Sequence, residues 1–185
     1  MVQALSIRTK LIMAMLALVG SVALMGMIAD DANAAGVTEI RWVENHTPYP
    51  VYVRNHESGA LKLISPYNAV SYNQWVPWAT NEDEFNRGKY IQIGWQGDGQ
   101  YDGVGNPCIL GLCPTFAIWQ EGHNRQPYPG DKIRYTRPTG LNFYYNPSAP
   151  PMAGASDTGG RRNLIITHTV EPTTGNAIMQ AGLSY

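Results

Sequence analysis

Hydrophobic and polar residues alternate along most of the chain after residue 35, with the period of two that is typical of half-buried β-strands. Glycine, proline and asparagine separate the alternating runs, as turn residues do. The pattern predicts strands at 38–44, 51–55, 61–64, 69–75, 89–95, 115–120, 131–136, 164–170 and 177–181. No 15-residue window holds the 3.6-residue period of a long helix. We therefore expect an all-β fold: one antiparallel β-sandwich domain over residues 35–185, jelly-roll or immunoglobulin-like, with about eight or nine short strands.

Three tryptophans fall inside these alternating runs. Trp42 shares a face with Ile40 and lies opposite Val43, while Trp95 and Trp119 belong to later strands. Large aromatic side chains in alternating strands are typical of a buried core. We therefore expect all three tryptophans in the core. Short turns connect the first three strands, which favours an antiparallel hairpin or meander.

Two segments between the strands lack the alternating pattern. Residues 81–88 are polar and include three consecutive acidic side chains, which a solvated loop accommodates. Residues 137–162 are rich in proline, glycine and serine, with one aromatic cluster at 143–145. We expect both segments to be loops.

The first 34 residues differ from the rest of the chain. Arg8 and Lys10 precede an apolar run of 18 residues at 11–28, and a small-x-small site follows at 32–34. This order predicts a secretory signal peptide. An uncleaved membrane anchor is the alternative, because 18 apolar residues are near the lower limit for a membrane span. In both cases we expect residues 35–185 to be secreted or periplasmic.

The charge balance disfavours one class of partner. The chain carries 13 Lys and Arg against 14 Asp and Glu, for a formal net charge of −1. The leader holds two residues of each sign, so the remainder keeps the same net charge. A near-neutral domain lacks the basic surface that nucleic acids attract. We therefore expect no nucleic-acid partner.

The two cysteines, Cys108 and Cys113, are four residues apart with a proline on the outer side of each. In an exported protein this spacing favours a disulfide that closes a small loop. A redox-active pair would need the C-x-x-C spacing, and a zinc site would need two further ligands. We expect the structural disulfide.

A glycine-rich loop at 94–106 precedes the cysteines and is the first candidate site. Its candidate ligand-binding residues are Asp98, Tyr101, Asp102 and Asn106. Three of them, Asp98, Asp102 and Asn106, offer the hard oxygen ligands that calcium takes, although the EF-hand spacing is absent. The alternatives are therefore a calcium site and a plain flexible loop, and we expect no other cofactor. Long loops on rigid sheets often carry binding residues.

Aromatic residues outside the strands form the second candidate site. Trp78, Tyr144 and Tyr145 lie in turn-rich segments, where exposure is expected. An exposed aromatic ring presents a flat apolar face that suits stacking on a sugar ring or contact with a lipid interface. Packing in the core is the alternative for each of them.

Catalytic patterns are weak in this sequence. No G-x-S-x-G motif is present, and no metal-binding spacing joins the four histidines His46, His56, His123 and His168. A carboxylate pair for glycoside hydrolysis is defined by spatial separation. The acidic residues eligible for such a pair include Glu44, Glu57, Asp102, Glu121 and Asp131. Binding is therefore favoured over catalysis.

The turn at 45–48 contains a possible glycosylation signal and is part of a resemblance to a class of secreted proteins. Asn45-His46-Thr47 matches the N-glycosylation pattern, a single match that Pro48 follows. The order of leader, N-terminal strands with this Asn-x-Thr-Pro turn, and tryptophan-rich middle resembles small secreted β-sandwich lectins and cytolysins in architecture, without a matched motif. We therefore expect an exported module that binds a glycan or another cell-surface component. A membrane-active protein of the cytolysin kind and, further off, a secreted hydrolase are the alternatives.

Overall fold

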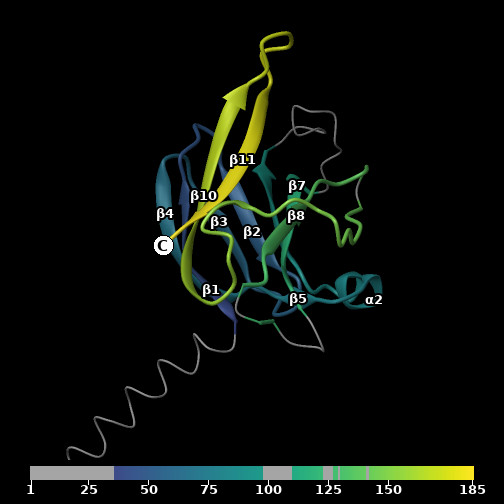
Figure 1. Cartoon of the computed structure of the whole chain (residues 1–185). Helices are drawn as coiled ribbons and strands as arrows, with labels where there is room; N and C mark the ends of the chain where they lie inside the picture. The colour runs from purple at the N-terminus through teal and green to yellow at the C-terminus, as the bar shows by residue number, and fades with distance from the viewer. Residues whose placement is uncertain (1–35, 98–109, 123–126, 129, 141) are drawn as a thin grey trace, which may run out of the picture.

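A computed structural model of the chain describes residues 36–97, 110–122, 127–128, 130–140 and 142–185 (Figure 1). Within these ranges nearly all regular structure is β, in two sheets. No helix in the described ranges has the length and apolarity that crossing a membrane requires. The predicted signal peptide, residues 1–34, lies outside the described residues, so cleavage or anchoring stays a prediction.

Sheet A has five strands. Its order is β4 (Asn68–Trp75), β1 (Thr38–Asn45), β10 (Gly160–Val170), β11 (Ala177–Ser184) and β9 (Ala153–Gly154). The pairs β1–β4 and β10–β11 are antiparallel, whereas β1–β10 and β11–β9 are parallel. The β10–β11 hairpin extends past the rest of the sheet at the top of Figure 1.

Sheet B has six strands. Its order is β3 (Leu61–Ile64), β2 (Val51–Asn55), β6 (Ile91–Gln96), β7 (Leu112–Glu121) and β5 (Trp78–Ala79), and β8 (Ile133–Thr136) also pairs with β7. All of these pairs are antiparallel except β5–β7.

The nine predicted strands are all present, and β5 and β9 add two short strands. Two expectations about their pairing are wrong. The sheets are mixed rather than antiparallel throughout, because β1 pairs in parallel with β10, more than 100 residues later in the chain. The first three strands also do not form one meander, although β2 and β3 pair as the antiparallel hairpin that was the other expectation. Strand β1 belongs to sheet A and β2 to sheet B, and the chain passes between the sheets in the Pro48–Pro50 turn. The jelly-roll or immunoglobulin type stays a prediction.

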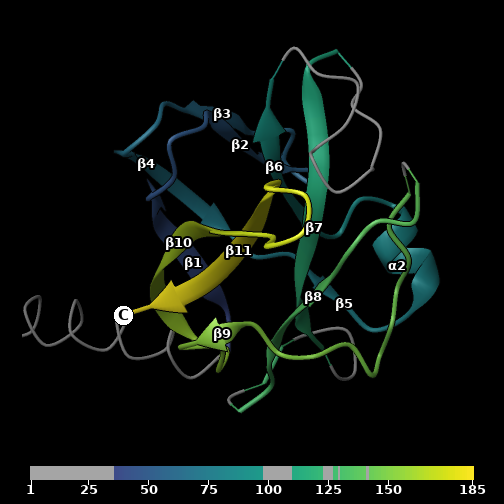
Figure 2. The same ribbon diagram turned by 90° about the horizontal axis from the view of Figure 1, so that it is seen from above.

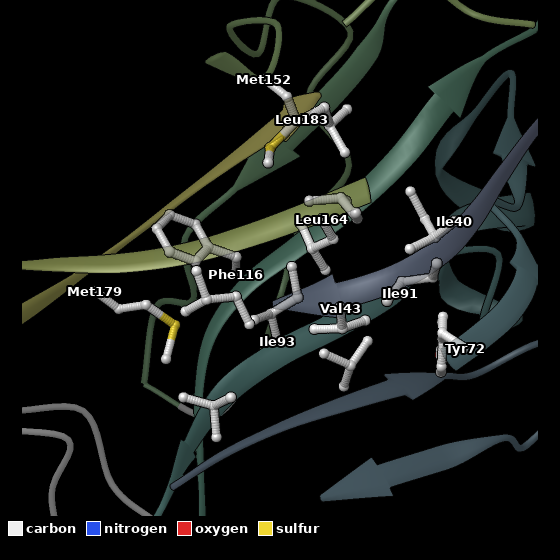
Figure 3. Close-up of a cluster of buried hydrophobic side chains, with 14 of the residues drawn as sticks. Ile40, Val43, Tyr72, Ile91, Ile93, Phe116, Met152, Leu164, Met179 and Leu183 are labelled. Carbon is white, nitrogen blue, oxygen red and sulfur yellow. The ribbon is translucent and has the colours of Figure 1, made fainter. Parts of the chain in front are cut away.

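The hydrophobic core lies between the two sheets (Figure 3). Sheet A contributes side chains such as Val43, Leu164 and Ile166, and sheet B contributes Ile91, Ile93 and others, all completely buried. Alternation along each strand places these residues on the inner face and their neighbours on the outer face. The two outer faces are therefore the surfaces on which a binding site can form.

The prediction that Trp42 is a core residue is wrong. The register of β1 against both neighbouring strands shifts between Ile40 and Trp42, which marks a β-bulge. The extra residue reverses the alternation, so Ile40 and Val43 are buried whereas Trp42 is 39% exposed. Trp95 and Trp119 are buried, as predicted.

The prediction of a loop at 81–88 is also wrong, because residues Glu82–Asn86 form the short helix α2. The Asn81 side chain accepts a hydrogen bond from the Glu84 N–H, which is the geometry of a helix N-cap. Acidic residues in the first turn are favourable next to the positive end of the helix dipole. The acidic run is thus a helix-start signal.

Helix α2 covers part of the outer face of sheet B, which lies between α2 and sheet A when the molecule is seen from above (Figure 2). Phe85 of α2 packs there with Trp119 and Ala117 of β7, Ala79 of β5 and Ala149 in a second buried cluster. Tyr90, Phe143 and Tyr145 pack against this cluster. The loop between β8 and β9 therefore folds back onto sheet B together with α2.

Three buried carboxamide side chains link the two sheets. Asn45 at the end of β1 donates to the carbonyl oxygens of Ile64 and Ser65, at 3.3 and 3.0 Å. Asn55 at the end of β2 donates to the Trp75 carbonyl at 3.0 Å. Gln120 of β7 donates to the Val76 carbonyl and accepts from the Thr38 N–H, both at 2.8 Å. Each amide satisfies backbone groups of the opposite sheet or of the connection leaving it.

The buried position of Asn45 also decides the meaning of the Asn45-His46-Thr47 match. Asn45 is completely buried, and its side-chain nitrogen is engaged in hydrogen bonds. A glycosylation acceptor must instead be reachable on the surface. In the folded chain the pattern is therefore a structural turn.

We predict that Asn45→Ala lowers the free energy of unfolding by about 3 kcal/mol, because it leaves buried carbonyl groups without a donor. Chemical denaturation in urea measures this loss. The matched control is Asn68→Ala, since Asn68 is exposed and accepts from the adjacent Ala69 N–H, and we expect it to cost less than about 1 kcal/mol. Equal losses in the two variants would contradict the linking role of Asn45.

Candidate functional site

A groove with a volume of about 500 Å³ lies on the outer face of sheet B. Its floor comes from β2, β6 and the start of β7, and its walls come from α2 and from residues 142–144. The groove therefore brings together segments that are far apart in the sequence.

The floor of the groove is set by strand alternation. Val51 and Val53 of β2 are completely buried between the sheets, so Arg54 points to the outer face. Ile91 and Ile93 of β6 are buried in the same way, and Gln92 points outward between them. Because Arg54 and Gln92 are directly paired across the two strands, they lie side by side in the floor.

Gln92 is the centre of a polar chain in this floor. Its Oε1 lies 2.6 Å from His56 Nε2, and its Nε2 donates to the Tyr52 hydroxyl at 2.5 Å. In this arrangement Nε2 of His56 carries the proton, which makes Nδ1 the acceptor nitrogen.

The turn that carries His56 is fixed by Asn55. The Asn55 side-chain oxygen accepts from the N–H groups of Glu57 and Ser58, at 2.9 and 3.2 Å. The His56 N–H in turn donates to the Tyr90 carbonyl at 3.1 Å. His56 is therefore held at the end of β2 by backbone as well as side-chain contacts.

Burial keeps the titratable groups of the polar chain neutral. The pKa of His56 is lowered, first by burial and further by the nearby Arg54 guanidinium, while the hydrogen bond to Gln92 opposes the shift. Burial raises the pKa of Tyr52 and of Tyr90. Neutral pH therefore finds the imidazole and both phenols uncharged, and Arg54 carries the positive charge of the groove.

One wall of the groove is a stack of aromatic rings. Tyr90 lies between His56 and Phe85, with ring centroids 4.5 and 4.7 Å away and nearly parallel planes. Phe143 lies 5.9 Å from Tyr90 on the same wall. Tyr144 follows, and 51% of its surface is exposed. The wall is thus rigid at Tyr90 and open at Tyr144.

Gly94 provides the space for Tyr52 beneath this site. A Cβ atom at position 94 would lie 2.8 Å from Cε1 of Tyr52 and 2.0 Å from the carbonyl oxygen of Cys113. A side chain there would displace the Tyr52 ring or the start of β7. Glycine at this position therefore permits the Tyr52–Gln92–His56 chain to form.

The groove offers two kinds of contact to a small molecule. The aromatic wall presents flat apolar faces, and the floor presents a guanidinium, an amide and an imidazole. Its described lining contains no Asp or Glu, and the described part of the chain holds no cluster of three potential metal ligands. The lining therefore fits recognition of a neutral or anionic polar molecule.

The predicted aromatic site residues are divided by the structure. Tyr144 lines the groove. Tyr145 packs instead against Phe85 and Trp119, and it lines a separate cavity of about 270 Å³. Trp78 is half-buried in β5, with the Lys89 ammonium 4.8 Å from its ring centroid. The three residues do not form one surface.

The loop candidates Asp98, Tyr101, Asp102 and Asn106 lie outside the described residues, so the calcium site and the binding loop stay predictions. Cys108 also lies outside them. Its predicted partner Cys113 is buried at the start of β7, and the described residues include no free cysteine. The disulfide itself therefore stays a prediction.

Sequence reasoning assigned no binding role to most residues of the groove, including Arg54, His56, Tyr90 and Gln92. The available signal was local: a polar residue between two isoleucines at 91–93 indicates an outward side chain. The pairing of β2 with β6 places Gln92 beside Arg54, 38 residues away, and no local pattern predicts it.

Comparison of the chain with protein-family models, with curated proteins and with solved structures gives no match in any of the three. The geometry of the groove is therefore the basis on which a function can be proposed.

We predict that Arg54→Gln raises the pKa of His56 while leaving it below the ordinary histidine value of about 6.5, because burial is the larger cause of the shift. Histidine signals followed by NMR over a pH titration measure this. Arg41→Gln, at an exposed arginine of β1 in sheet A, is the control and should leave the His56 pKa unchanged. No change in either variant would contradict the electrostatic coupling.

The lowered pKa of His56 also makes the stability of the folded chain depend on pH. Because the folded state lowers the His56 pKa, the unfolded chain binds this proton more readily. The contribution of neutral His56 is present in full above the unfolded pKa of about 6.5 and is lost as the pH falls toward the folded pKa. Arg54→Gln should reduce that loss.

Proposed function

We propose that the chain is an exported β-sandwich module that binds a saccharide in the groove on sheet B. The observation that carries the proposal is the groove itself, where an aromatic wall faces a floor of planar polar side chains. Export rests on the predicted leader at residues 1–34, and we propose a secreted or periplasmic location on that basis.

The aromatic wall supports this choice of ligand. A sugar ring has one apolar face of C–H groups, and such a face packs well on an exposed aromatic ring. Tyr144 is half exposed, and the neighbouring Tyr90 and Phe143 are held by ring contacts. Little conformational entropy is therefore lost at the wall when a ligand binds.

The polar floor supports the same choice. Sugar hydroxyl groups both donate and accept hydrogen bonds, and they are read by planar side chains in fixed orientations. Gln92 is oriented by Tyr52 and His56, so its position does not depend on the ligand. Asn86 and Asn142 add two exposed amides at the rim.

The hydrolase alternative lacks comparable support. Glycoside hydrolysis usually employs two carboxyl groups on either side of the scissile bond. Of the acidic residues that the sequence made eligible, Glu57 pairs with Lys89 and Glu121 pairs with Arg134. Neither lines the groove.

Membrane contact is the second candidate, and it is favoured by two adjoining turns. Tyr49 and Tyr67 are 46% and 72% exposed, and the Tyr67 N–H donates to the Thr47 carbonyl, which joins the two turns. Exposed tyrosines suit the membrane interface. Binding to lipid vesicles that Tyr67→Ala abolishes, without any saccharide binding, would favour this candidate over the first.

We predict that Tyr144→Ala weakens saccharide binding at least tenfold, which corresponds to about 1.4 kcal/mol. A glycan array identifies the saccharide bound by the full chain, and isothermal titration calorimetry measures its Kd. Tyr144→Phe should retain most of the affinity, because the ring face remains.

The control for this experiment is Tyr67→Ala. Tyr67 is more exposed than Tyr144 but lies in the β3–β4 turn, away from the groove lining. We expect its loss to leave the Kd unchanged. An empty array, or binding that survives Tyr144→Ala at full strength, would overturn the proposed function.

A further inference from the structure

Arg54 differs from four other arginines of the described chain, each of which contacts a carboxylate or an aromatic ring. Arg134 and Arg161 pair with the carboxylates of Glu121 and Glu39, at 2.5 and 3.1 Å. Arg137 and Arg162 lie over aromatic rings. Among the described residues Arg54 has no carboxylate partner, and it alone of these five lines the groove. Arg41 and Arg87 also have no carboxylate partner among the described residues, but they do not line the groove.

Among the described residues, no acidic side chain pairs with Arg54. Glu57, the acidic residue closest to it in the sequence, is paired with Lys89 at 3.6 Å. The described lining of the groove has no other charged side chain than Arg54, apart from the histidine that burial keeps neutral. Within the described part of the chain, Arg54 is therefore an exposed positive charge in a partly apolar groove, without a paired counter-charge.

The position of Arg54 would allow its side chain to contact a ligand in the groove. It stands on a strand, between Leu61 of β3 on one side and Gln92 of β6 on the other. A guanidinium on a rigid strand offers two parallel N–H groups, which match the two oxygens of a carboxylate. Arg54 itself is exposed, and apolar residues of the groove lining lie beside it.

We propose that the saccharide bound in the groove is anionic and carries a carboxylate, as in a uronic or sialic acid, which pairs with Arg54. This inference rests on the proposed function and specifies its ligand. The sugar ring would lie against the Tyr90–Tyr144 wall while the carboxylate meets the guanidinium. The two contacts belong to different elements, so each can be removed separately.

The test compares ligands that differ in this charge. Tetragalacturonic acid and its methyl ester have the same rings with and without the carboxylate charges, and 3′-sialyllactose and lactose differ by the sialic acid. Calorimetry with the full chain should show the charged member of at least one pair binding tenfold or more tightly than its neutral counterpart. The pair that shows the preference distinguishes a uronate from a sialate. Added salt should reduce the difference in Kd between the charged and the neutral saccharide, because salt screens the charge.

Substitution of Arg54 provides the second arm. Arg54→Gln should bring the Kd of the charged saccharide to within about twofold of its neutral counterpart. Arg54→Lys, which keeps the charge without the paired N–H groups, should retain part of the preference. Arg41→Gln, on sheet A, should leave it intact. Near-UV circular dichroism verifies folding, and Arg54→Lys carries the test if Arg54→Gln does not fold.

The outcomes separate the two proposals. Equal affinity for charged and neutral saccharides, both lost in Tyr144→Ala, would overturn the anionic ligand and leave saccharide binding standing. A preference for the charged form that Arg54→Gln leaves unchanged would overturn the role of Arg54. Absence of binding to both pairs and to the glycan array would overturn the proposed function and this inference together.

Discussion

The hydrogen bonds of three buried amides are the constraint on which the arrangement of the two sheets depends. The hydrophobic core is non-directional and would tolerate a range of positions of one sheet over the other. Asn45, Asn55 and Gln120 remove that freedom, because each must meet specific backbone groups across the core or leave them unsatisfied. Asn55 is the one that reaches the groove, since its oxygen orders the turn that carries His56. The Asn55 side chain thus both links the two sheets and fixes the turn that places His56 in the groove.

The outer face of sheet B becomes a site because a second layer covers only part of it. Phe85 of α2 and the segment ending at Ala149 bury the end of the sheet around Trp119. Arg54 and Gln92 lie beside that layer, so they face a wall on one side and solvent on the other. The Tyr90 ring belongs to both environments: it packs on Phe85 and stacks on His56. A groove forms where the covered and open parts of one sheet meet.

The sequence predicted the all-β class and all nine longer strands, because the period of two is a local property. It did not predict the side-chain directions in β1, since a bulge between Ile40 and Trp42 reverses the alternation without a clear local signal. Helix α2 was not predicted, although Asn81 followed by three acidic residues is a typical sequence signal for the start of a helix. Most of the groove was also missed, because the pairings that assemble it join residues distant in the chain, as Arg54 and Gln92 are. Tyr144 was predicted from exposure alone, and the same reasoning placed Tyr145 and Trp78 beside it, where the structure separates them.

The polar groups of the groove differ in how many of their hydrogen bonds and ion pairs are made within the protein. Gln92 uses its amide oxygen and one amide N–H within the chain, so it serves as a fixed support. Arg54 lies next to it without a carboxylate partner among the described residues, in a position that strand pairing fixes. Strand pairing fixes the backbone of Arg54 beside an already ordered amide, so only the Arg54 side chain has to be ordered when a ligand binds. Because His56 is kept neutral, it adds no second charge that would favour a doubly anionic ligand. The described lining of the groove therefore offers one positive charge at one place, with an apolar surface beside it.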